Sequence, residues 1–120
     1  MTTPVLRCLV FALLCMPFLA AQEGEPHPGQ SQFDFANGLF HRGFFEDAAE
    51  QYQAYLKDYP DAPEKGTAQY RLAESSYAGQ HYEEALQAFD AVLAASPDAN
   101  LAQAARLSRG EVLYFLKRHE

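Results

Sequence analysis

Hydrophobic residues recur with helical spacing along most of the chain after residue 31. In the clearest stretch, residues 45–59, apolar side chains fall at i, i+3, i+4, i+7, i+10, i+11 and i+14, which places them on one helical face. No stretch alternates apolar and polar residues as a half-buried strand would, so we expect an all-α protein. The expected helices cover about residues 32–41, 44–59, 62–78, 82–95 and 99–117.

Capping residues are expected at the start of two of these helices. Ser31 can accept a backbone hydrogen bond at the start of the first helix, with Asp34 at its third position. Asp61 and Glu64 have the spacing of a capping box before the third helix. Both patterns predict a side chain that satisfies free backbone N–H groups.

An eight-residue segment recurs at a distance of 37 residues. Residues 45–52 read FEDAAEQY and residues 82–89 read YEEALQAF, and each copy is followed at the same distance by Pro-Asp-Ala. A fixed period in this range is typical of stacked helical repeats. Small residues recur where two paired helices must approach closely: Ala36, Ala73, Gly110, Ala48 and Ala85.

The repeat defines the expected organisation of the chain. We predict helix–turn–helix repeats that stack as an α-α superhelix, with about 2.5 repeats in all. Repeat one covers about residues 32–60, repeat two about 61–97, and a partial third repeat about 98–120.

The two copies resemble the tetratricopeptide repeat family. Its motif has a small and an aromatic residue in the first helix, glycine near the turn, then an aromatic residue, alanine, a second aromatic residue and a closing proline. Repeat one supplies Ala36, Phe40, Gly43, Phe45, Ala48, Tyr52 and Pro60. Repeat two supplies Ala73, Tyr77, Gly79, Tyr82, Ala85, Phe89 and Pro97, and the partial repeat begins with Gly110 and Tyr114. The resemblance implies a non-catalytic module that binds a protein or peptide.

The chain departs from that family pattern in three ways. The period is 37 residues, where about 34 is usual. The longer loops, of the form Tyr-Pro-Asp-Ala-Pro, resemble a cell-envelope subgroup that includes the Tol-Pal-associated coordinator of cell division and the outer-membrane assembly lipoproteins. Arg109 stands where the other copies have the apolar Phe35 and Leu72. The sequence ends at Glu120, where the second helix of repeat three is expected, so we expect either a fragment of a longer array or a fifth helix that meets a partner, and favour the fragment.

In this family the first helix of each pair lines a concave groove. Carried over by position, the resemblance implies a groove that binds an extended peptide or an amphipathic helix. Its expected lining is Phe33, Asn37, Phe40, Tyr70, Glu74, Tyr77, Leu107, Glu111 and Tyr114. The alternative is that the aromatic residues are core between stacked helices. We favour the core for Phe40, Tyr77 and Tyr114, and leave Phe33 and Tyr70 open.

The N-terminus is expected to be an export signal. Arg7 precedes 14 uncharged, mostly apolar residues that end in Leu19-Ala20-Ala21, too short a run for the roughly 20 residues that span a membrane. Residues 1–21 are therefore expected to be a signal peptide that is cleaved, or else retained as an anchor, in a periplasmic or cell-envelope protein. Residues 22–31, rich in proline and glycine, are expected to form a flexible linker.

Charge and chemistry exclude several functions. In residues 22–120, sixteen acidic and eight basic side chains leave a net charge of −8, which disfavours nucleic acid. Both cysteines lie in the signal, and the histidines His27, His41, His81 and His119 lack the spacing of a metal site. These histidines are interpreted as solvated residues of the linker and turns. No catalytic set is recognisable, so we expect no enzyme, no cofactor, no metal and no small-molecule substrate.

Three functions remain open. The preferred one is an exported interaction scaffold of the cell envelope. The second is the N-terminal docking arm of a larger exported enzyme or secretion component. The third is a structural array that self-associates through the fifth helix.

Overall fold

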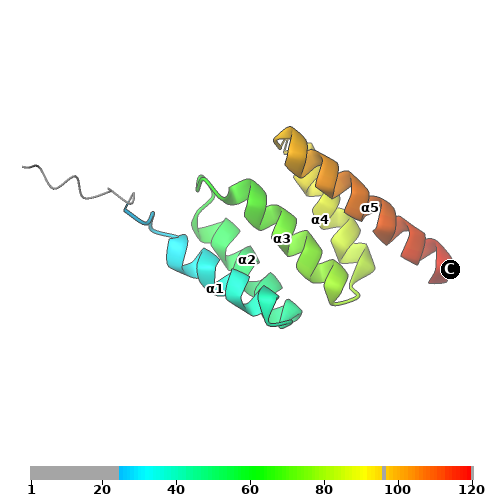
Figure 1. The fold of residues 1–120 in the computed structure, drawn as a ribbon, viewed down its shortest axis with the longest axis horizontal. Helices are drawn as coiled ribbons and strands as arrows, with labels where there is room; N and C mark the ends of the chain where they lie inside the picture. The colour runs from blue at the N-terminus through cyan, green and yellow to red at the C-terminus, as the bar shows by residue number, and fades with distance from the viewer. Residues whose placement is uncertain (1–24, 96, 120) are drawn as a thin grey trace, which may run out of the picture.

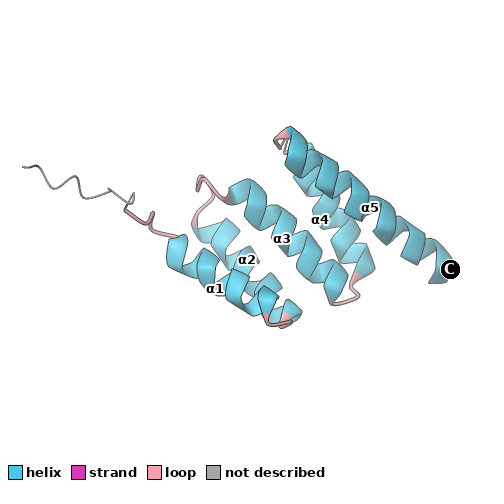
Figure 2. Ribbon diagram, in the orientation of Figure 1, coloured by secondary structure: helices cyan, strands magenta, loops and turns pink. Residues whose placement is uncertain are grey.

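Five helices make up the part of the protein that the computed structural model describes, residues 25–95 and 97–119 (Figure 1). They are α1 (Gln30–His41), α2 (Phe45–Asp58), α3 (Lys65–Ala78), α4 (Tyr82–Ala94) and α5 (Ala99–His119). No strand occurs in these residues (Figure 2). The predicted all-α repeat architecture is confirmed, and the signal peptide predicted for residues 1–21 lies outside the described residues.

The helices form two layers. Each helix packs against the next one along the chain, and α3 also contacts α5. Figure 1 shows α1, α3 and α5 nearer the viewer, with α2 and α4 behind them. The first helices of the pairs therefore share one surface of the array, and the second helices share the other.

Two apolar clusters form the core, and α3 contributes to both. The first cluster contains Phe33, Ala36, Ala48, Tyr52, Tyr55 and Ala68. The second contains Ala73, Ala85, Phe89, Val92, Ala105 and Val112. Ala68 and Ala73 lie on different sides of α3, so this helix completes the core of repeat one and begins that of repeat two. Burial of a large apolar side chain contributes about 1.5–3 kcal/mol, and Tyr52, Tyr55 and Phe89 are fully buried.

The turns inside the two pairs repeat the same backbone conformation. Gly43 has a φ of +83° between α1 and α2, and Gln80, 37 residues later, has a φ of +65° between α3 and α4. The left-handed region favours glycine because it lacks a Cβ atom. Gln80 is nevertheless forced into it, since α4 must return across α3 as α2 returns across α1.

Both predicted helix caps are wrong. Ser31 lies inside α1, which begins at Gln30 after Gly29, and no side chain caps it. Glu64 directly precedes α3, but its carboxylate accepts a hydrogen bond from Tyr55 Oη at 3.1 Å and caps nothing. The Glu64 side chain, which the local sequence pattern predicts to cap the helix, instead makes a tertiary hydrogen bond with Tyr55. Asp98, which the sequence pattern did not mark as a cap, precedes α5, and its Oδ1 accepts a hydrogen bond from the N–H of Leu101 at 2.9 Å.

The described part of the expected linker, residues 25–31, is packed against the array. Gly29 is buried, and its N–H donates to His27 Nδ1 at 3.2 Å. His27 Nε2 lies 2.6 Å from Glu64 Oε2, so this histidine is not the solvated residue that we expected. The segment covers the end of repeat one because Tyr55 and Tyr59 leave a space there that only a residue without a side chain fits.

We predict that Gly29→Ala destabilises the fold. A Cβ atom at Gly29 would lie 2.7 Å from Tyr59 Cδ2 and 2.8 Å from Tyr55 Cε2, and such overpacking costs about 1–3 kcal/mol. The matched control is Gly38→Ala in α1, where an added Cβ meets nothing within 4 Å. The control should gain roughly 0.5–1 kcal/mol. Urea unfolding followed by circular dichroism measures both changes, and equal effects at the two glycines would contradict the prediction.

Candidate partner-binding surface

In repeat one, three positions of α1 hold the second helix of the pair. Phe33 and Tyr52 have ring centroids 6.2 Å apart, and Phe40 and Phe45 have theirs 5.6 Å apart. Ala36, between Phe33 and Phe40 in the sequence, is fully buried in the same cluster as Ala48. Phe33 is only 8% exposed, so of the two alternatives left open for it, groove or core, the structure supports the core. It belongs to the core because the aromatic residues of α2 cover it.

Repeat two uses the same three positions of α3. The Tyr70 and Phe89 rings lie 5.8 Å apart, and the Tyr77 and Tyr82 rings 6.0 Å apart. Ala73 is fully buried in the cluster that holds Phe89. Tyr70 and Tyr77 remain partly exposed, but each has one side against α4. Positions 33, 36 and 40 of α1, and the corresponding positions 70, 73 and 77 of α3, therefore face the second helix of their own pair.

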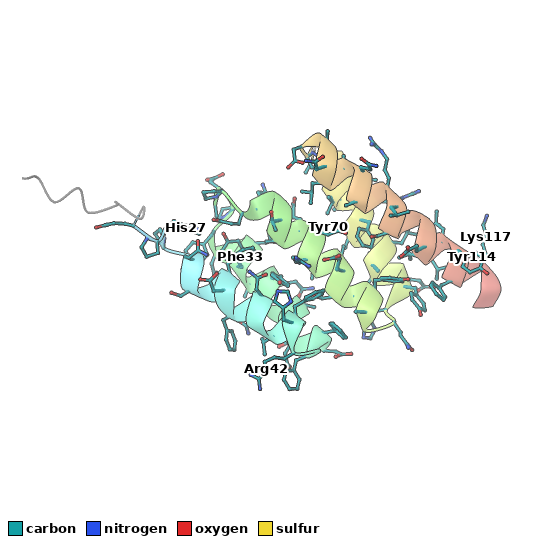
Figure 3. All side chains as sticks on the ribbon, viewed as in Figure 1. His27, Phe33, Arg42, Tyr70, Tyr114 and Lys117 are labelled. Atoms are coloured by element: carbon teal, nitrogen blue, oxygen red, sulfur yellow. The ribbon has the colours of Figure 1, made fainter. Side chains whose placement is uncertain are left out.

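The corresponding positions of α5 are Leu107, Gly110 and Tyr114, and they are open. Leu107 is 68% exposed and Tyr114 is 59% exposed. The buried residues of α5, such as Ala105 and Val112, lie on its opposite side and face α4. Figure 3 shows Tyr114 near the end of α5, at the opposite end of the array from His27. Within the described residues, α3 borders this side of α5 through Tyr77, but no helix covers Leu107 or Tyr114.

A groove of about 650 Å³ lies along this open side. It is lined by Tyr77, Arg106, Leu107, Gly110, Glu111, Tyr114 and Phe115. Phe115 stabilises its edge, because its ring stacks on that of Tyr82 at 5.3 Å and lies 6.1 Å from that of Tyr77. The groove thus has an aromatic and aliphatic lining with one cation and one carboxylate.

The polar residues of the predicted groove mostly serve the array itself. Asn37 accepts a hydrogen bond from Tyr52 Oη at 2.6 Å. Arg71 Nη1 donates to Glu74 Oε2 at 2.8 Å, and its guanidinium lies 5.1 Å from the centre of the Phe40 ring. These contacts tie α1, α2 and α3 together, so Asn37 and Glu74 are held by neighbours. Glu111 is exposed at the groove, where its carboxylate interacts with the Tyr77 hydroxyl and adds to the rise in the pKa of that phenol.

Arg109, which departs from the repeat pattern, has a structural role. Its Nε donates to Asp90 Oδ1, which joins α5 to α4 across the repeat boundary. At the equivalent position Leu72 packs against the first core cluster, whereas Phe35 is 55% exposed. Arg109 thus adds a partly exposed ion pair to the apolar packing that joins α5 to α4.

Burial raises the pKa of several tyrosines. The pKa of Tyr52 and that of Tyr55 are raised from 10.0 to about 12, mainly by burial, with the Glu64 carboxylate adding to the effect at Tyr55. Burial also raises the pKa of Tyr70 and of Tyr77. All four phenols therefore remain neutral hydrogen-bond donors over the ordinary pH range.

The described residues hold no group of three histidine, cysteine or acidic side chains able to bind a metal ion. His41 and His81 are exposed at turns, and the side chain of His119 lies outside the described part. None of the helices described is long and apolar enough to cross a membrane.

Residues 33–100 match the family model of the tetratricopeptide repeat. The match covers more than half of the chain, so the protein belongs to the tetratricopeptide repeat family. Neither a curated protein nor a solved structure matches it. Tetratricopeptide repeats generally mediate protein–protein interaction and are typically non-catalytic scaffolds.

We predict that alkaline pH unfolds the array between about pH 10 and 12. The folded pKa of about 12 for Tyr52 and Tyr55 exceeds the unfolded value of 10.0. Their stabilisation is therefore complete below pH 10 and is lost as the pH rises toward 12. Circular dichroism and tyrosinate absorbance, measured on the same samples, should change together.

The control for this prediction is Tyr52→Phe. This variant should be less stable at neutral pH, because Asn37 loses its donor, and its stability should decline less steeply above pH 10. Ionisation of Tyr52 and Tyr55 near pH 10 with no loss of helix would contradict the prediction.

Proposed function

We propose that this protein is a non-catalytic scaffold that binds a peptide or helix of a protein partner, and that the groove along α5 is the contact region. The observation that carries the proposal is the exposure of Leu107 and Tyr114 at repeat positions that are buried or partly buried in the other two repeats. Exposed apolar residues next to charged ones are typical of interaction sites. Membership of the tetratricopeptide family supports this class of function.

The lining of the groove suits a protein partner. Leu107, Tyr114 and the Tyr77–Phe115 edge offer an apolar centre for one or two anchoring side chains. Arg106 and Glu111 supply the polar rim that interfaces commonly have. Two other polar residues of the expected groove are already engaged within the array, because Asn37 accepts a hydrogen bond from Tyr52 and Glu74 accepts one from Arg71.

We further propose that the scaffold works in the cell envelope after export. The support is the N-terminal sequence, in which Arg7 precedes a run of 14 uncharged, mostly apolar residues that ends in Ala20-Ala21. The absence of cysteine from residues 22–120 is compatible with an oxidising compartment. The loop pattern Tyr-Pro-Asp-Ala-Pro, similar to that of an envelope subgroup, adds to this support.

A site-specific crosslink tests the contact region. A photoreactive amino acid in place of Leu107 should crosslink the chain to a discrete protein partner in the cells that make it, because this position is 68% exposed in the groove. The same amino acid in place of Lys57, exposed on α2, serves as the control. Mass spectrometry identifies the product. Equal crosslinking from both positions, or none from Leu107, would reject the groove as the binding site.

The intact mass of the protein from its own cells tests export. We expect a form that has lost residues 1–21 and begins near Gln22. A charge within the apolar run, as in Leu13→Arg, should abolish processing, because signal peptides require an uncharged central segment. Accumulation of unprocessed wild-type chain in the cytoplasm would refute the envelope proposal and leave the interaction proposal standing.

A further inference from the structure

A second hollow surface lies between α2 and α4, the second helices of the two complete pairs. Both helices pack on α3, whose buried residues Ser75 and Ser76 form the floor between them. Two hollows, of about 330 and 210 Å³, share Gln53, Ser76 and Glu84 in their linings, so they adjoin one another. Together they are called the α2–α4 groove. No residue of this groove lines the groove along α5.

The walls of the α2–α4 groove carry carboxylates and no fixed positive charge. Glu46 and Glu50 come from α2 and Glu84 from α4, and all three are exposed. Among the described residues no lysine or arginine lines either hollow, and Lys57 of α2 lies far along that helix from Glu46. His81, which can gain a positive charge, is half exposed and lies 3.7 Å from Glu46 Oε1. The groove is therefore complementary to a cationic ligand.

A buried hydroxyl on the floor of the groove independently indicates a ligand. Ser76 is only 7% exposed, and its hydroxyl has no hydrogen-bond partner among the described residues. The adjacent Ser75 differs, because its hydroxyl donates to the carbonyl oxygen of Arg71 at 2.8 Å. In the other repeats the position of Ser76 is held by Leu39 and Leu113. Since a buried hydroxyl without a partner is unfavourable, serine at this position fits one that receives a hydrogen bond from a ligand.

Carboxylates at the start of a helix would not by themselves indicate a site. Glu46 and Glu84 lie in the first turns of α2 and α4, where the positive end of the helix dipole favours them without any ligand. Glu50 lies beyond the first turn, and Ser76 is near the end of α3, so the dipole explains neither. These two residues are what distinguish the groove from an ordinary pair of helix ends.

The dimensions of the groove favour side chains as its occupants. Each hollow is near or below the low end of the range for drug-sized molecules, about 300–1,000 Å³. The described carboxylates and histidines form no group able to hold a metal ion. Glu46, Glu50 and Gln53 are spaced i, i+4 and i+7 on one face of α2, over a length of about 10 Å. Three residues of an extended chain, at about 3.3 Å each, cover that length and place alternate side chains on one face.

We propose that the α2–α4 groove binds an extended basic segment of a partner protein, with two arginine or lysine side chains that enter the two hollows. The carboxylates of Glu46, Glu50 and Glu84 accept hydrogen bonds from these cations, and Ser76 Oγ accepts one more. The inference goes beyond the proposed function, because it assigns a second binding surface that shares no residue with the groove along α5.

A short peptide, Gly-Arg-Gly-Arg-Gly with a fluorescent label, is the probe, titrated with the full chain and followed by anisotropy. We expect saturable binding that weakens as salt is added, and no binding of the same peptide with glutamine in place of arginine. Ser76→Ala should weaken binding about tenfold, as expected for loss of a hydrogen bond to a charged group. It should also raise the urea midpoint, because it removes an unpartnered buried hydroxyl. Raised stability with unchanged affinity would overturn the inference.

A pair of neighbouring charge variants separates the groove from general charge attraction. Glu84→Gln should weaken binding about two- to fivefold, the size expected for one partly exposed ion pair. Glu83→Gln changes the net charge equally at a residue that lines neither hollow, so it should leave the affinity unchanged. Equal effects of the two variants would mean that the peptide responds only to the overall negative charge of the chain, and the inference would fail.

Three further results would overturn the inference. The first is no saturable binding of the arginine peptide at low salt. The second is spermidine that binds as tightly as the peptide, because the groove would then be a site for a small organic cation. The third is a dimer in light scattering that the arginine peptide converts to a monomer, because the groove would then hold a basic segment of a second copy. None of these results changes the crosslink expected from Leu107, so the inference and the proposed function can fail separately.

Discussion

The close approach of two helices at a pair of alanines is the contact on which the rest of the array depends. Ala36 of α1 and Ala48 of α2 belong to the first core cluster, and Ala73 of α3 and Ala85 of α4 belong to the second. All four are fully buried, so a larger side chain would separate the helices. The distance they permit lets aromatic residues on either side of them interlock. It also explains why the turns must fold back sharply, even with Gln80 at a φ of +65°.

Stacking follows because no pair of helices buries both of its faces alone. The helix α3 has one side in the core of repeat one, through Ala68, and another in the core of repeat two, through Ala73. Polar contacts reinforce the arrangement, since Arg71 of α3 lies over the Phe40 ring of α1. The helix α5 repeats the contact with the preceding pair and adds an ion pair between Arg109 and α4. Each helix is thus held by its neighbours in sequence, and the array has local contacts throughout.

Comparison of the repeats explains why one side of α5 is exposed. A repeat unit has two faces on its first helix, one for the preceding pair and one for its own second helix. On α5 only the first is occupied within the described residues. Leu107 then becomes an exposed apolar residue, although its counterpart Phe33 is buried and its counterpart Tyr70 is partly buried.

How far the sequence predicts this protein depends on how local each feature is. The helices and the repeat were predictable to within a few residues, since periodicity and Pro-Asp-Ala loops are properties of the chain alone. The small-residue positions were predictable too, because their spacing repeats. The helix caps were predicted wrongly. At α3 the reason is that the Glu64 carboxylate accepts a hydrogen bond from Tyr55, nine residues away.

The site was only partly predictable, for a related reason. Equal spacing makes Phe33 and Leu107 equivalent in sequence, yet one is 8% and the other 68% exposed. Which of them a neighbouring helix covers is decided by the position of the repeat in the stack. By itself, then, the sequence determined the helices, their period and the side chains presented on each face. Only the tertiary structure decided which faces are buried, because burial requires a second surface that no single segment contains.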